Sequence, residues 1–170
     1  MIKKLLLAVL LAAPLCLSAQ TLKFGTVNTQ ELFNVMPEKA TAEAALKDAA
    51  SKFEMEAKKL EDNLVKQQQE LQALDQDTTT PVAIKERRAQ EFQESYQKYQ
   101  NFQQTANNEL QKTQQTLLAP IQEKMQKAIQ AVGAENGYTF IYDLSIPTLL
   151  YVGQGAEDVT PLVKAKLGIN

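Results

Sequence analysis

Residues 46–74 have the sequence LKDAASKFEMEAKKLEDNLVKQQQELQAL, and a heptad repeat in this stretch decides the fold. One set of mostly apolar positions recurs every seven residues, and a second set follows the first by four residues. Such spacing places the side chains in a stripe along one side of a helix, where a partner helix covers them. The repeat contains Leu46, Phe53, Leu60, Gln67 and Leu74, interleaved with Ala50, Ala57, Leu64 and Leu71.

Glycine and proline set the limits of the helical region. Residues 26–132 contain no glycine, and Pro37 and Pro81 suit the first turn of a helix. The polar segment 75–81 lacks an apolar anchor and is rich in turn-forming residues. We therefore predict two long helices, residues 38–76 and 81–132. Together they form an antiparallel coiled-coil hairpin arm over residues 38–132, with its turn near residues 75–81.

The second predicted helix carries an apolar stripe of its own, with a period nearer to 3.6 residues. A turn near Thr78 sets Leu110 opposite Leu46 and Ala106 opposite Ala50. We call the line of contact between the two helices the seam. It is predicted to contain Leu46, Phe53, Leu60, Leu64 and Leu71 from the first helix, and Phe92, Tyr96, Tyr99, Leu110 and Leu117 from the second.

Both ends of the chain have a different character. Aromatic and β-branched runs predict strands at residues 22–27, 138–142 and 149–152, and a capped apolar segment predicts a closing helix over residues 158–167. These segments form a small β body, residues 20–37 plus 133–170, in a mostly α protein. The body is too small to bury a sturdy core alone, so we expect chains to associate through it. The side chains assigned to the body are Phe24, Val27, Phe140, Tyr142, Val152 and Leu162.

The first residues have the pattern of a secretory signal peptide. Lys3 and Lys4 precede a short apolar run, and cleavage after Ala19 would remove residues 1–19. A second interpretation makes Cys16 the site of a lipid anchor, and a third leaves the segment uncut in the membrane. No later apolar run approaches membrane length, so we expect an exported chain without stable membrane insertion.

Composition argues against several classes of function. The chain has no histidine and one cysteine, so it has neither a histidine-based catalytic triad nor a His- or Cys-rich metal site. Its 18 basic and 20 acidic residues give no basic bias of the kind that favours nucleic acid. The acidic residues show no paired arrangement suited to catalysis. We therefore expect no enzymatic activity, no cofactor and no metal.

Several motifs, taken in order along the chain, resemble the Skp/OmpH-like periplasmic chaperones of Gram-negative bacteria. The resemblance spans the whole chain after the signal peptide. It is carried by Lys23-Phe24-Gly25-Thr26-Val27-Asn28 with Leu32-Phe33, by Pro120-Ile121-Gln122-Glu123-Lys124-Met125 running to Gly137-Tyr138, by Phe140-Ile141-Tyr142-Asp143, and by Asp158-Val159-Thr160.

The resemblance implies a homotrimer with a β-barrel-like body built from all three chains. Three hairpin arms would extend from this body around a central cavity. Members of the family hold unfolded outer membrane proteins in the periplasm without ATP and prevent their aggregation. The alternative from the same features is a structural coiled-coil trimer that serves as an envelope spacer or adaptor.

The arm departs from the family pattern in its charge. The best-known arms are strongly basic, whereas residues 38–130 here contain 13 basic and 15 acidic side chains. The basic residues Lys85, Arg87 and Arg88 are interleaved with Glu86 and followed by Glu91. We interpret them as an exposed charge run near the turn, and we expect no lipopolysaccharide site there. The alternative is a contact with lipid head groups.

Contacts with unfolded clients require apolar side chains that the seam leaves free. Residues on the stripe pack between the helices, so they cannot also cover a client. The client-binding candidates are therefore apolar residues that lie off the predicted stripe, namely Met55, Val65, Phe102 and Leu118. The alternative is that they are isolated apolar residues on the solvent-exposed surface and have no role in binding.

Overall fold

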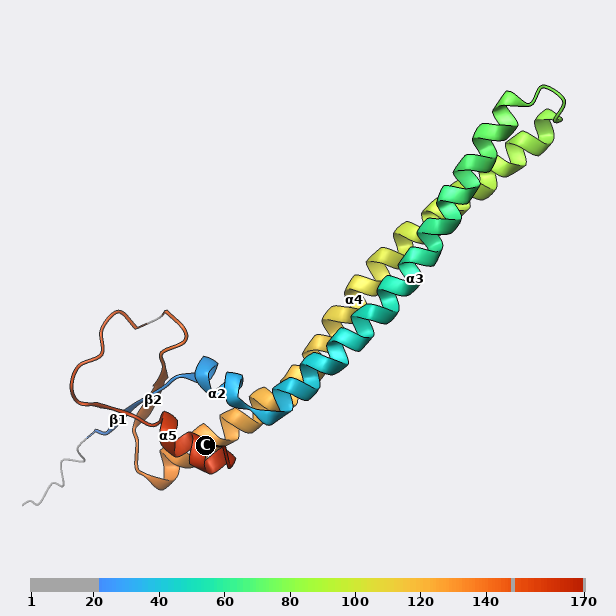
Figure 1. Cartoon of the computed structure of the whole chain (residues 1–170). Coiled ribbons are helices and arrows are strands. Elements are labelled where there is room, and N and C mark those ends of the chain that lie inside the picture. The colour runs from blue at the N-terminus through green and yellow to red at the C-terminus, as the bar shows by residue number, and fades with distance from the viewer. Residues whose placement is uncertain (1–21, 148, 170) are drawn as a thin grey trace, which may run out of the picture.

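The chain forms a long helix pair attached to a small α/β body (Figure 1). The computed structural model describes residues 22–147 and 149–169, so the predicted signal peptide and Cys16 lie outside the described residues. The helix pair consists of α3 (Pro37–Gln76) and α4 (Val82–Glu135), and the body contains the other elements. These are β1 (Phe24–Val27), α2 (Thr29–Val35), β2 (Phe140–Asp143), β3 (Ala156–Asp158) and α5 (Thr160–Leu167).

The two long helices lie antiparallel along most of their length (Figure 1). α3 has 40 residues and starts at Pro37, where the missing N–H costs nothing in the first turn. α4 has 54 residues and continues through Pro120 to Glu135. At 1.5 Å per residue these helices are about 60 Å and about 80 Å long.

The seam follows the predicted heptads on α3 and the predicted register between the helices. All nine repeat positions from Leu46 to Leu74 are partly or fully buried. Ala50 and Ala106 line the same hollow in the helix pair, and Leu46 and Leu110 line a neighbouring one.

Two predictions for α4 are wrong. Tyr96 is predicted in the seam but is 47% exposed, and Phe102 is predicted outside the seam. The Phe102 ring instead lies 6.2 Å from the Phe53 ring, and Phe102 and Ser95 are both partly buried. From Phe92 to Ala106 the partly or fully buried positions advance by alternating steps of three and four residues, so Ser95 lies in the seam where Tyr96 is predicted.

The body is a parallel sheet with strand order β2-β1-β3, covered on one face by helices. Four side chains of the core are almost completely inaccessible: Val27, Leu32, Val159 and Val163. Gly25 on β1 is required by this packing, because a Cβ there would lie 3.1–3.2 Å from Val159, Ile141 and Tyr138. The last turns of α4 complete the core through Ile121, Met125, Ala128 and Val132.

The body also departs from its predicted form. The segment 149–152 is a loop rather than a strand, and the third strand is the more polar β3. Of the side chains assigned to the body, Val27 is buried and Phe24 is partly buried. The other four are 40–55% exposed in the single chain: Phe140, Tyr142, Val152 and Leu162.

Replacing Leu32 with alanine is expected to lower the free energy of unfolding by about 2–5 kcal/mol, because a fully buried leucine leaves a cavity. Val35 lies in the same short helix but is 41% exposed, so Val35→Ala should cost less than about 1 kcal/mol. Urea unfolding followed by circular dichroism measures both. Equal losses would contradict the placement of α2 against the core.

Candidate functional site

The uncovered face of the sheet carries aromatic side chains. Phe24 and Phe140 are paired across β1 and β2, and their rings stack with centroids 6.3 Å apart. Tyr142 lies two residues after Phe140, on the same face, with ring centroids 6.0 Å apart. α4 and α5 cover the opposite face through Val27 and Ile141, whereas no helix of the described chain covers the face with Phe24, Phe140 and Tyr142.

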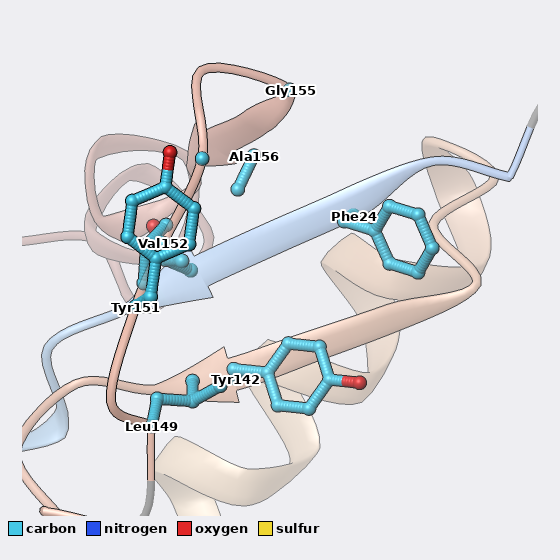
Figure 2. A pocket seen from close by; sticks show the side chains of 9 residues that line it. Phe24, Tyr142, Leu149, Tyr151, Val152, Gly155 and Ala156 are labelled. Atoms are coloured by element: carbon cyan, nitrogen blue, oxygen red, sulfur yellow. The ribbon is translucent and has the colours of Figure 1, made fainter.

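A loop after β2 extends this apolar face. Leu149, Tyr151 and Val152 approach the sheet beside Phe24 and Tyr142 and enclose a hollow of about 250 Å³ (Figure 2). Tyr151 is 82% exposed even so. We call the sheet side chains and these loop residues together the aromatic face. An exposed apolar surface of this kind is typical of a protein–protein contact.

Asp143 fixes one end of the sheet to α2. Its carboxylate accepts hydrogen bonds from the Thr29 backbone N–H at 3.2 Å and the Thr29 hydroxyl at 2.5 Å, and from Ser145. Burial by itself raises the pKa of Asp143, but the hydrogen bonds from Thr29 and Ser145 outweigh burial and hold the pKa below its ordinary value. All of these groups are satisfied by one another, so the cluster is structural.

Lys23, Tyr138 and Glu157 form a second polar group at the surface of the body. The Tyr138 hydroxyl donates to Glu157 at 2.5 Å, and the Lys23 ammonium lies 3.2 Å from the same carboxylate. The Lys23 ammonium also lies 4.1 Å from the centre of the Tyr138 ring. These bonds lower the pKa of Glu157 and raise that of Lys23. The group joins β1 to β3 and contains no unpaired nucleophile or base.

No cluster of metal-ligating side chains occurs among residues 22–147 and 149–169. Within the same ranges, no helix is both long and apolar enough to cross a bilayer.

The structure separates the four client-binding candidates. Met55 and Val65 are 57% and 47% exposed on α3. Leu118 instead lines a hollow at the base of the helix pair, beside Phe33 of α2. Phe102 is in the seam, as described above. Two further apolar residues are exposed near the turn and were missed in the sequence, Val82 and Ile84.

The turn between α3 and α4 pairs its own charges. The Lys85 ammonium donates to the backbone carbonyl of Asp77 at 2.7 Å, and Arg88 forms an ion pair with Glu91 at 2.8 Å. Arg87 also reaches Glu91, at 3.5 Å. The basic side chains near the turn are therefore paired with the Glu91 carboxylate and the Asp77 backbone carbonyl.

The carboxylate of Asp77 is expected to titrate with a pKa of about 2 in the folded chain. It accepts hydrogen bonds from the Thr79 hydroxyl and backbone N–H and from the Thr80 hydroxyl, which favour the charged form. Because the folded pKa is lowered from 3.8, the stabilisation of the turn is complete above that pH and is lost as the pH falls through about 2.

Carboxyl carbon shifts measured by NMR against pH follow this titration. The double variant Thr79→Ala/Thr80→Val should move the midpoint of Asp77 up toward 3.8. Thr78→Ala is the control, because Thr78 makes no hydrogen bond to Asp77 in the described structure. A midpoint that is unchanged in the double variant would contradict the assigned cause.

Comparison with known proteins gives a family match and a similar solved structure. The family model described as "Outer membrane protein (OmpH-like)" matches residues 23–167. The fold is similar to a crystal structure of a candidate outer membrane chaperone (OmpH-like) from Caulobacter crescentus CB15, with a TM-score of 0.70. The two chains are 18% identical, and the match covers 86% of this chain and 83% of the other. No curated protein matches the chain.

Proposed function

The chain belongs to the OmpH-like outer membrane protein family, and from that membership we propose that it is an ATP-independent holdase chaperone of the periplasm. A holdase binds unfolded chains and keeps them from aggregating without doing chemistry on them. The clients proposed here are unfolded outer membrane proteins. The single observation that carries the proposal is the joining of a long, exposed helix pair to a body with an uncovered aromatic face.

We propose that three copies associate through the aromatic face. Phe140, Tyr142, Tyr151 and Val152 are each 41–82% exposed in the single chain, and burying them would supply the core that three short strands lack. In such a trimer the three helix pairs extend from one body as arms. The space between the arms is then the proposed client cavity.

Client binding in this cavity requires many weak contacts, so that no single contact resists release. Met55 and Val65 are exposed on α3 and remain proposed client contacts. Leu118 contributes at the base of the helix pair, through the hollow that it shares with Phe33. Phe102 is withdrawn as a client contact, because its ring packs against Phe53 in the seam.

Association through the aromatic face predicts that Phe140→Asp lowers the native mass from three chains to one. A carboxylate on this face cannot be buried without a partner, so it opposes the assembled state. Analytical ultracentrifugation or light scattering measures the mass. Val82→Asp is the control, because Val82 is 69% exposed at the far end of the helix pair. A three-chain mass that persists in Phe140→Asp would place the interface elsewhere.

The holdase proposal predicts that the purified protein suppresses aggregation of an unfolded outer membrane β-barrel diluted from urea, with no nucleotide present. Light scattering at several ratios of chaperone to barrel measures the effect. Replacing residues 50–106 with a short turn keeps Ala42, Ile121 and Met125 in the core of the body, so it should leave an associating body that no longer suppresses aggregation. No suppression by the full protein at several-fold excess would favour an envelope spacer or adaptor.

A further inference from the structure

A continuous groove runs along one flank of the seam, from Ala57 in α3 to Phe33 in α2. It consists of three adjoining hollows of about 380, 420 and 240 Å³. The hollows are continuous because neighbours share lining residues. The first and second share Ala50, Asn107 and Leu110, and the second and third share Leu46 and Gln114.

Small side chains in the seam open the floor of this groove. Ala50 and Ala57 of α3 and Ala106 of α4 line its first hollow, where larger residues would fill the space. The rest of the floor is apolar and includes Leu46 and Leu110. An apolar side chain of a bound segment therefore has space beside Ala50 in which it is shielded from water.

One wall of the groove is a line of amide side chains on α4: Gln103, Asn107, Gln111 and Gln114. Steps of four, four and three residues keep them on one side of the helix. Gln103 donates to the Tyr99 hydroxyl at 2.8 Å. The side chains of the other three make no hydrogen bond within the described residues, so they have free donors and acceptors. We call the whole feature the amide groove.

The spacing of the amides suits an extended polypeptide. Residues four apart in a helix are about 6 Å apart along its axis, and residues three apart, as Gln111 and Gln114 are, lie about 4.5 Å apart. An extended chain presents backbone groups on one edge every second residue, about 6.6 Å apart. Flexible glutamine side chains absorb the small difference. A helical segment offers no such groups, because its own turns satisfy them.

The charged side chains that line the groove are both acidic. Glu43 and Glu54 lie on the α3 side, and no lysine or arginine lines any of the three hollows. Glu43 is 3.5 Å from the Lys39 ammonium, whereas Glu54 forms no ion pair within the described residues. This arrangement favours a segment that carries lysine or arginine and disfavours one that carries aspartate or glutamate.

We infer, on the basis of the proposed holdase function, that the amide groove binds an extended, neutral or basic segment of an unfolded client. Asn107, Gln111 and Gln114 hydrogen-bond to the backbone of the segment, and its apolar side chains enter the floor beside Ala50 and Ala106. Because the hydrogen bonds go to the backbone, the groove selects conformation and charge rather than a sequence.

The amide wall is tested with Asn107→Ala/Gln111→Ala/Gln114→Ala. The matched control Gln104→Ala/Asn108→Ala/Gln115→Ala removes the same amides from exposed positions outside the groove. The probe is a short fluorescein-labelled peptide of alternating valine and serine with two lysines, and fluorescence anisotropy measures its affinity. The groove variant should bind about tenfold more weakly, since three hydrogen bonds are lost. The control should stay within about twofold of wild type.

Charge selection is tested by comparing this peptide with one in which two glutamates replace the lysines. Wild type should prefer the lysine peptide, and Glu54→Lys should reverse the order. Asp48→Lys makes the same change in net charge on α3 outside the groove, and it should leave the order unchanged. Equal effects of the two variants would show a response to net charge alone and overturn the charge assignment.

The same variants separate failure of the groove from failure of the holdase proposal. Circular dichroism first confirms that helix content is retained, which alanine favours. If wild type suppresses aggregation of an unfolded barrel and the groove variant binds peptide and barrel equally well, the groove inference is wrong and the holdase proposal stands. If wild type binds neither, the holdase proposal fails and the inference fails with it.

Discussion

The end of α4 is the constraint on which the rest of the structure depends. Ile121, Met125, Ala128 and Val132 belong both to the long helix and to the core of the body, so the helix leaves the body without a linker. Three strands of three or four residues are too short to be stable without that helix against them. The direction of α4 is therefore fixed by the packing of the body, and α3 follows it through Ala42 in the same core and through the seam.

A pair of helices with no third layer can bury only one narrow line of side chains. Among the described residues of α3 that lie beyond the body, only Leu64 is fully buried. Most other seam residues are partly exposed. Both flanks of the seam remain open to water as a result. Amide side chains on a flank can hydrogen-bond to water. The line from Gln103 to Gln114 therefore needs no hydrogen-bond partners within the protein.

The regular heptad spacing allowed α3 to be predicted from the sequence. The predictions fail where packing between elements, and not the local pattern, determines the structure. On α4 the apolar pattern predicts Tyr96 in the seam, but the spacing of the buried positions places the smaller Ser95 there. Residues 149–152 have strand-forming side chains and yet form a loop. β3 has poor strand propensity and pairs with β1 because the buried Val159 and its bond to the Thr26 carbonyl hold the chain there. The local sequence pattern also does not predict that Phe140 and Tyr142 are exposed in the single chain.

The aromatic face and the amide groove differ in the kind of binding that each supports. The aromatic face places aromatic rings around a hollow beside the sheet, and a partner would remove these rings from water together. Aromatic residues of this kind are typical of stable protein–protein interfaces. In the proposed complex, the polar wall of the groove would exchange hydrogen bonds with water for similar bonds with the client, so each bond would add little net free energy. Affinity for such a client would then grow with the length of the bound segment, and it would fall as that segment folds and satisfies its own backbone. Folding of the client would therefore release it from the groove without a nucleotide.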